Sequence, residues 1–188
     1  MKQIALFASG SGSNAEKIVE HFKDSSKAQV KMILCNNPNA GVIARAERLN
    51  IPLLMFEKED LKSGKITEIL LENKIDLIVL AGFLWLIPKN LVTAFPRKII
   101  NLHPALLPKY GGKGMYGHFV HEAVIANKEK KSGITIHYVN EHYDEGDVIF
   151  QAWFSISEND TVEDIALKGQ ILEHQHFPEV IAKLLRVK

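Results

Sequence analysis

The chain has 188 residues, of which 46% are hydrophobic and 24% are charged. These values are ordinary for a globular protein and exclude a disordered chain. Lys and Arg number 23 against 22 Asp and Glu, a balance that excludes the basic surface needed for non-specific nucleic-acid binding. We expect one domain over 1–188, in which local groups hold any anionic ligand.

The cysteine content and the first residues indicate a compartment. Cys35 is the one cysteine, within the apolar run "VKMILC", which excludes an internal disulfide and predicts a buried thiol in a reducing compartment. The opening "MKQIALFASGSG" leads straight into a glycine turn, and no stretch approaches the roughly 20 apolar residues of a membrane span. We therefore expect a cytoplasmic, soluble protein with no membrane partner.

Short apolar runs alternate with helical patterns through the first hundred residues. The run "DLIVLAGF" is almost wholly apolar, which is typical of a parallel strand covered on both faces. The order of elements predicts an α/β fold with a doubly wound, mostly parallel sheet and right-handed crossovers. The expected strands are 3–8, 30–35, 51–56, 76–83 and 97–103, and the expected helices are 14–23, 40–49 and 65–73.

The later part of the chain changes character. A helix is predicted at 119–127, and strands at 133–139 and 147–156 are joined by a short acidic loop. These two strands are expected to pair antiparallel, which makes the sheet mixed. From Thr161 a helix is expected to about His176, and Pro178 permits a second segment or a kink beyond it.

A glycine-rich loop, "ASGSGSN", follows the first strand and opens the first helix. One interpretation is a tight turn with a capping box, in which Ser13 caps the helix and Glu16 reaches back. A compatible functional interpretation is that Gly10 and Gly12 let a ligand approach backbone and side-chain donors. The loop lacks the Lys of a P-loop and the third glycine of a dinucleotide fingerprint. We therefore expect it to bind a single phosphate group, through Ser11, Gly12, Ser13 and Asn14.

Asn101 and His103 stand two positions apart at the end of the strand 97–103, ahead of Pro104 and Pro108. Ligands of open α/β sheets bind beyond the carboxyl ends of parallel strands, where these two side chains should emerge. For an isolated pair, the favoured interpretation would be packing of the histidine in a loop and a turn tied down by the asparagine.

The acidic loop between the last two strands supplies a third candidate. Asp144 and Asp147 flank a Glu-Gly pair, and a solvated hairpin turn is the usual interpretation of such a loop. A carboxylate near His103 would instead favour the imidazolium and raise the histidine pKa, giving a proton donor near neutral pH. An Asn amide and an imidazolium that face one point can stabilise an oxyanion, which suits acyl transfer without a covalent enzyme intermediate.

The eight histidines raise the question of a metal site. His174 and His176 are two apart on a predicted helix and so do not share a face. His137 and His142 have no cysteine or suitably spaced carboxylate signature around them. We expect no metal.

Five segments resemble, in order and spacing, the phosphoribosylglycinamide formyltransferase family: "SGSGSN", "LAGF", "NLHPALLPKY", "HYVNEHYDEGDVIFQ" and "LEHQHFP". The N-x-H-P-x-L-L-P segment with the downstream Asp is typical of the wider folate-dependent formyltransferase superfamily. The S-G-x-G-S-N loop and the short length indicate the glycinamide ribonucleotide branch. The resemblance implies a Rossmann-like formyltransferase fold and an enzyme of purine biosynthesis. Its reaction would transfer the formyl group of the cosubstrate 10-formyltetrahydrofolate to the amino group of 5'-phosphoribosylglycinamide.

The resemblance also implies roles for particular residues. The catalytic group would be Asn101, His103 and Asp144. The loop 11–14 would hold the ribonucleotide phosphate, with Gln170 and Glu173 near the ribose and glycinamide. The folate would be contacted, largely through backbone groups, by Leu84, Trp85, Leu86, Ile87, Asn101, Val139 and Asn140, and Lys58 would replace the family's folate-tail arginine.

The chain departs from the family pattern at two places. Trp85 stands where many members have an arginine, and "GGKGMYGH" replaces a compact Pro-Gly-x-His turn, with His118 matching that histidine. The segment 109–118 is therefore longer than usual, while the catalytic group is unchanged.

Other functions are compatible with parts of the pattern. A 10-formyltetrahydrofolate hydrolase would use the same Asn, His and Asp, but its relatives carry a regulatory domain and need no phosphate loop. Formyl transfer to methionyl-tRNA would require a further C-terminal domain and a basic surface. A noncatalytic phosphate-ligand sensor is a third alternative. The expected partners are small molecules without nucleic acid, in a monomer or homodimer.

Overall fold

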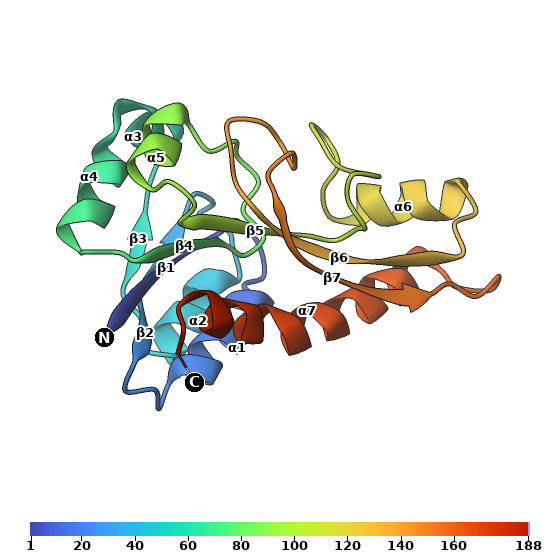
Figure 1. Ribbon diagram of the computed structural model, residues 1–188, viewed down its shortest axis with the longest axis horizontal. Coiled ribbons are helices and arrows are strands. Elements are labelled where there is room, and N and C mark those ends of the chain that lie inside the picture. The colour runs from blue at the N-terminus through green and yellow to red at the C-terminus, as the bar shows by residue number, and fades with distance from the viewer. Residues whose placement is uncertain (188) are drawn as a thin grey trace.

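Seven strands form one sheet in the computed structural model, which describes residues 1–187 (Figure 1). Their order across the sheet is β3-β2-β1-β4-β5-β6-β7. The first five strands run parallel, and β6 and β7 are antiparallel to their neighbours, so the prediction of a mixed, mostly parallel sheet is confirmed. The strands are β1 (Lys2–Ala8), β2 (Ala28–Cys35), β3 (Leu53–Met55), β4 (Leu77–Leu80), β5 (Ile99–His103), β6 (Lys131–Tyr138) and β7 (Val148–Ser155).

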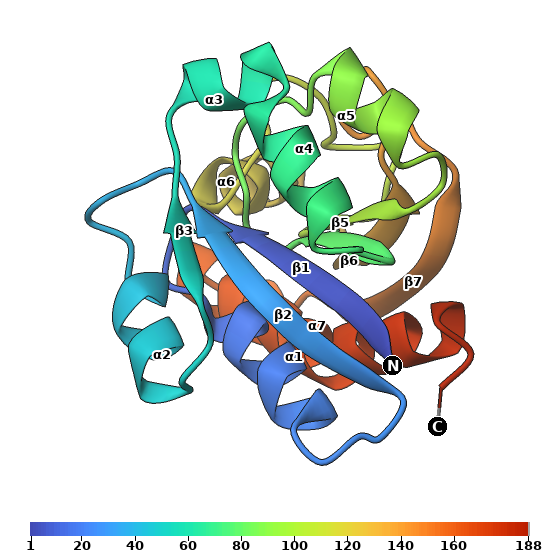
Figure 2. The ribbon, with the colours of Figure 1, turned by 90° about the vertical axis from the view of Figure 1, so that its left-hand side faces the viewer.

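Helices cover both faces of the sheet because alternate residues of the buried strands point to opposite sides. In β1, Ile4, Leu6 and Ala8 pack in one core cluster with α1, α2 and α7. Ala5 and Phe7 pack in the other cluster with α3, α4 and α5 (Figure 2). The helices are α1 (Ser13–Phe22), α2 (Val42–Arg48), α3 (Lys58–Ser63), α4 (Lys65–Glu72), α5 (Lys89–Ala94), α6 (His118–Ala126) and α7 (Val162–Leu184).

The strand order reverses between β1 and β4, which are neighbours in the sheet although β2 and β3 separate them in the sequence. At such a switch point the connections leave in opposite directions and open a crevice at the carboxyl ends of the strands. The glycine-rich loop after β1 and the segment after β4 therefore meet there, where the Ser9 N–H donates to the Gly82 carbonyl at 3.0 Å.

Two short helices were not expected from the sequence. Each of α3 and α5 has six residues and one buried side chain, Leu61 and Leu91 respectively, so neither shows an apolar period. The expected helix end at about His176 was wrong, because α7 continues through Pro178 to Leu184. Phe177, Pro178, Val180 and Ile181 are buried along this stretch, and their packing holds the helix in place.

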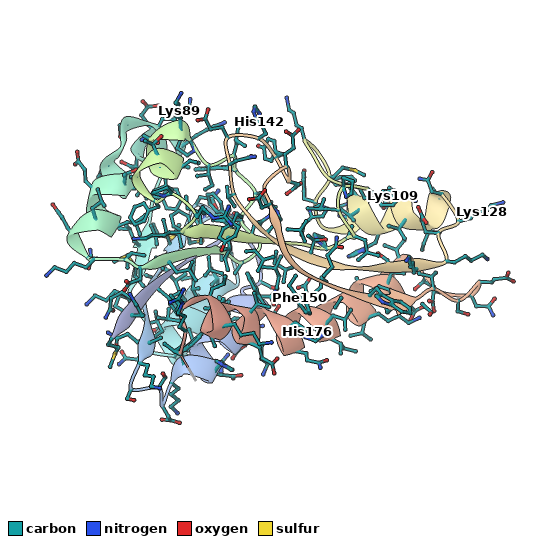
Figure 3. All side chains as sticks on the ribbon, in the orientation of Figure 1. Lys89, Lys109, Lys128, His142, Phe150 and His176 are labelled. Atoms are coloured by element: carbon teal, nitrogen blue, oxygen red, sulfur yellow. The ribbon has the colours of Figure 1, made fainter. Side chains whose placement is uncertain are left out.

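Three further features concern Cys35, His176 and the length of the helices. Cys35 is a buried free thiol at the end of β2, as expected. The ring of His176 packs on Phe150 of β7, with centroids 4.9 Å apart (Figure 3). Within residues 1–187, no helix is both long and apolar enough to cross a membrane.

Candidate active site

A cavity of about 570 Å³ lies at the carboxyl ends of β4 and β5. The segment after β4, the loop between β6 and β7, the segment before α6 and one face of α7 complete its walls. Its apolar lining residues include Phe83, Leu84, Trp85, Leu86, Ile87 and Val139, which we call the apolar wall. Its polar lining residues include Asn14, Asn101, His103, His137, Asp144, Gln170 and Glu173. The cavity thus combines an apolar surface with polar and titratable groups.

The glycine-rich loop makes a left-handed turn before α1. Gly12 has φ 79°, and a Cβ on it would lie 2.6 Å from Cβ of Val42, so only glycine fits here. The expected capping box is absent: Gly12 is the N-cap, no side chain caps the helix, and Glu16 pairs with Arg45 and Arg48 instead. The left-handed turn displaces Ser13 into the first helical position, where it cannot cap.

Two hydrogen bonds from helix α2 hold the glycine-rich loop in place. The Arg45 Nε donates to the Ser11 carbonyl at 2.9 Å, and the Val42 N–H donates to the Gly10 carbonyl at 3.1 Å. Ser11 is exposed and is not among the residues that line the cavity, whereas Asn14 is. The first turn of α1 therefore has a fixed position next to the cavity, and its N-terminal N–H groups suit an anion.

The glycine-rich loop and α7 contact each other through side chains. Asn14 Nδ2 donates to Glu173 Oε2 at 2.6 Å, and Gln170 Nε2 donates to Ser13 Oγ at 3.4 Å. Asn14 Oδ1 is buried without a partner, which leaves a hydrogen-bond acceptor for a ligand. Burial raises the pKa of Glu173, although the hydrogen bond from Asn14 opposes this effect.

Replacing Glu173 by Gln is expected to stabilise the free protein in a pH-dependent way. Because its pKa is raised in the folded state, the carboxyl stabilises the fold fully only below its ordinary pKa. That contribution is lost as the pH rises through the raised value. Glu173→Gln should therefore raise the unfolding temperature near neutral pH but not in acid. Glu179→Gln, at an exposed position on the same helix, should leave the unfolding temperature unchanged at both pH values. Equal shifts for the two variants would contradict the buried-acid assignment.

Asn101 and His103 emerge at the end of β5, and the loop after β6 brings Asp144 to them. Asp144 Oδ2 lies 3.5 Å from His103 Nδ1, and Asp144 Oδ1 lies 3.4 Å from Asn101 Nδ2. His137 lies beside these three residues, although the sequence did not indicate it. It stands directly opposite Asn101 across the β5–β6 ladder, and its Nε2 lies 3.5 Å from Asp144 Oδ1. We call Asn101, His103, His137 and Asp144 the His-Asp cluster.

The hydrogen bonds of the two rings fix where their protons lie. His103 Nε2 is 2.7 Å from the Tyr110 carbonyl, and His137 Nδ1 is 2.8 Å from the Tyr138 carbonyl. A carbonyl only accepts, so these nitrogens carry the proton of each neutral ring. The nitrogens that face Asp144 are then unprotonated, and the cluster can take up one further proton between a ring and the carboxylate.

The predicted rise in the pKa of His103 is wrong for the free protein. Burial lowers the pKa of His103, and the negative charge of Asp144 only partly offsets this effect. The ring is 3% exposed, and desolvation disfavours the imidazolium. Burial would raise the pKa of Asp144, but its polar contacts, among them the hydrogen bond from the Gly112 N–H, hold it below its ordinary value. The resting cluster therefore holds an ionised carboxylate beside a neutral His103.

Close backbone packing positions Asp144. Its own φ is 57°, in the left-handed region, and its Oδ2 accepts from the Gly112 N–H at 3.0 Å. A Cβ at Gly146 would lie 1.7 Å from the Tyr138 carbonyl, so the chain can turn here only with glycine. This acidic loop therefore forms part of the cavity wall and is not a solvated hairpin turn. Figure 3 shows His142 in the same loop.

The expected folate residues divide into two groups. Leu84, Trp85, Leu86, Ile87 and Val139 line the cavity, and Trp85 packs edge-on against Phe56 at 5.9 Å between ring centroids. Asn140 and Lys58 do not line it: the Asn140 side chain accepts from the His142 N–H, and Lys58 begins α3. Among the described lining residues, Lys113 is the one Lys or Arg.

His121 of α6 is another cavity residue that the sequence did not indicate. It is 7% exposed, and its Nδ1 is buried without a partner. Burial lowers the pKa of His121, and the neighbouring His103 lowers it further. Its signal in the sequence is only a histidine among the apolar residues of a helix, which usually denotes core packing. Over residues 1–187, no group of three or more His, Cys, Asp or Glu side chains is placed to hold a metal ion.

The fold described above is that of a formyl transferase. A sequence model of the family described as "Formyl transferase" matches residues 2–181, and the chain belongs to this family. It is 40% identical over 191 residues to phosphoribosylglycinamide formyltransferase of Bacillus subtilis, covering 98% of this chain and 95% of that protein. It is also 40% identical over 190 residues to the chloroplastic phosphoribosylglycinamide formyltransferase of Arabidopsis thaliana, covering 97% of this chain. The chain spans 65% of the length of that plant relative and 61% of the one from Vigna unguiculata.

Solved structures of the same kind share the fold. The chain is 36% identical to glycinamide ribonucleotide transformylase 1 from Geobacillus kaustophilus, with a TM-score of 0.89, covering 98% of this chain and 99% of that one. For phosphoribosylglycinamide formyltransferase from Bacillus halodurans the identity is 34% and the TM-score 0.88, with 98% and 95% covered. The formyltransferase fold expected from the sequence is confirmed.

Proposed function

We propose that this chain transfers the formyl group of 10-formyltetrahydrofolate to the amino group of 5'-phosphoribosylglycinamide. The proposal rests on one cavity that brings together the His-Asp cluster, Asn14 of the glycine-rich loop and the apolar wall at Trp85. A ribonucleotide phosphate suits the N-terminus of α1, and a planar pterin suits the apolar wall. The names of the relatives and of the similar structures support this assignment.

In the proposed reaction, the substrate amine attacks the formyl carbon, and the formyl oxygen becomes an oxyanion. Asn101 Nδ2 donates to this oxygen. The attacking nitrogen must lose a proton, and the His103–Asp144 pair can take it up because the facing ring nitrogen is unprotonated. The imidazolium thus forms as the oxyanion develops and stabilises it.

Collapse of this intermediate breaks the bond between the formyl carbon and N10 of the folate. The proton stored at the His103–Asp144 pair then passes to N10, directly or through water, and regenerates the neutral ring. The new amide and tetrahydrofolate leave. No resident metal or redox group takes part in this scheme, and proximity of the two bound substrates supplies much of the remaining acceleration.

The surroundings of the protein follow from the same proposal. Its partners would be the two small-molecule substrates, and we infer a cytoplasmic location, which the buried free thiol of Cys35 supports. A monomer and a homodimer are both compatible with a cavity whose described walls come from one chain.

Formyl transfer by the purified protein tests the function. Tetrahydrofolate should form from 10-formyltetrahydrofolate only when 5'-phosphoribosylglycinamide is present, with one formylated amine per tetrahydrofolate. Release of formate without the amine would indicate a hydrolase instead. Binding of the ribonucleotide without turnover would indicate a phosphate-ligand sensor.

A further inference from the structure

The segment before α6 contacts both members of the His103–Asp144 pair through its backbone. The Tyr110 carbonyl accepts from His103 Nε2 at 2.7 Å, and the Gly112 N–H donates to Asp144 Oδ2 at 3.0 Å. The conformation of residues 110–112 therefore sets the orientation of the ring and of the carboxylate together.

Tyr110 does not adopt this conformation by preference. Its φ is 58°, in the left-handed region, which is uncommon for a bulky side chain and persists only where surrounding contacts enforce it. The side chain supplies such a contact, because the Tyr110 hydroxyl donates to Glu129 Oε1 at 2.9 Å.

Glu129 is a fixed acceptor for this hydroxyl. It lies in the turn between α6 and β6, where its N–H donates to the Val124 carbonyl at 3.2 Å. The same carboxylate oxygen accepts from Lys109 Nζ at 2.8 Å, and Figure 3 shows Lys109 beside α6. Lys109 and then Tyr110 lower the pKa of Glu129, while burial and then Glu129 raise the pKa of Tyr110. The bond therefore joins a neutral phenol to an ionised carboxylate, which is a strong pairing.

We infer that Tyr110 and Glu129 are positioning residues for the reaction: their hydrogen bond holds the Tyr110 carbonyl against His103 Nε2 and so keeps Nδ1 facing Asp144. This inference rests on the proposed function. Neither side chain is among the residues that line the cavity, so they act through the backbone of residues 110–112. Without the bond, the strained turn at Tyr110 relaxes, and the ring loses the acceptor that fixes its proton on Nε2.

Tyr110→Phe tests the inference, because it keeps the aromatic ring and removes only the hydroxyl. The kcat of formyl transfer should fall by about 10-fold to 10²-fold, the scale of a small misplacement of catalytic groups. The KM values for both substrates should be unchanged, since Tyr110 lines neither subsite. Glu129→Met should reproduce this loss, and Glu129→Gln, which keeps an acceptor oxygen, should retain most of kcat.

Lys109→Met is the matched control, since it removes the other donor to the same Glu129 oxygen without touching the link to His103. Its kcat should equal that of the wild type. A loss as large as that of Tyr110→Phe would show that any disturbance of the Glu129 carboxylate slows the reaction, so that the effect is not specific to the phenol hydrogen bond, and would overturn the inference.

The nitrogen chemical shifts of His103, followed by NMR during a pH titration, provide a readout that does not depend on turnover. Tyr110→Phe should change the His103 titration and the fraction of the ring that carries its proton on Nε2. An unchanged titration would overturn the inference whatever the rate. If the wild type shows no formyl transfer, the proposed function fails, but the titration still decides whether Tyr110 positions His103.

Discussion

Replacement of Asp144 by Asn is expected to lower kcat by at least about 10²-fold, the scale of losing general acid-base assistance or one oxyanion donor. The carboxylate opposes the desolvation of His103, whose pKa is already lowered by burial. An uncharged amide removes this support, so the pKa of His103 should fall further. The ring could then not take the proton that leaves the attacking amine. Steady-state kinetics and NMR titration of His103 measure the two effects.

The same loop offers a matched control for this variant. Asp147 stands three residues further on, is 74% exposed at its side chain, and pairs with Arg97 outside the cavity. Asp147→Asn should leave kcat and the His103 titration unchanged. Similar rates for the Asp144→Asn variant and the wild type would refute the assigned role.

Gly12→Ala is expected to weaken ribonucleotide binding by about 10²-fold, since hydrogen bonds to a charged phosphate contribute roughly 1.5–3 kcal/mol each. The added Cβ would meet Val42 at 2.6 Å in a backbone conformation that favours glycine, so the loop must shift away from its ligand. Binding of a folate analogue, measured by calorimetry on the same sample, should be unaffected and would show that the variant is folded.

Gly169→Ala in α7 is the control for this variant, because Gly169 lies outside the loop and a Cβ there meets nothing within 4 Å. Its ribonucleotide affinity should match that of the wild type. The double variant Ser13→Ala with Asn14→Ala should lose ribonucleotide affinity but keep folate affinity. Equal losses of both affinities in these loop variants would mean that the loop does not hold the phosphate.

Most of the sheet could be predicted because its inner strands are marked by consecutive apolar residues in the sequence. "DLIVLAGF" reads as a strand covered on both faces, and the apolar face of α1, made by Ala15, Ile18, Val19 and Phe22, is buried as expected. Helices α3 and α5 each bury one side chain, so their sequences show no helical repeat of apolar residues. Local capping and tertiary contacts determine where these helices form. The continuation of α7 past Pro178 depends on its packing against the sheet. Such tertiary packing cannot be predicted from the local sequence around a proline.

Site residues at the end of a parallel strand could be predicted from the sequence. A residue that reaches the site only through the pairing of two strands could not. Asn101 and His103 emerge at the end of β5 because parallel strands end at one edge of the sheet. His137 joins them through the register of β5 with β6, which the sequence alone does not give. The direction of the His103 pKa shift depends on whether burial or the negative charge of Asp144 has the larger effect. A sequence pattern identifies the charge but not the burial.

Asp144 and His103 act as one unit in the proposed reaction, and a double-mutant cycle of the two residues tests this coupling. The kcat/KM values of Asp144→Asn, His103→Ala and the double variant are compared with that of the wild type. Residues that serve one proton transfer are non-additive, so the double variant should be little slower than the worse single variant. If the losses in log kcat/KM simply add, the two residues work independently, and the proposed proton uptake by the pair is wrong.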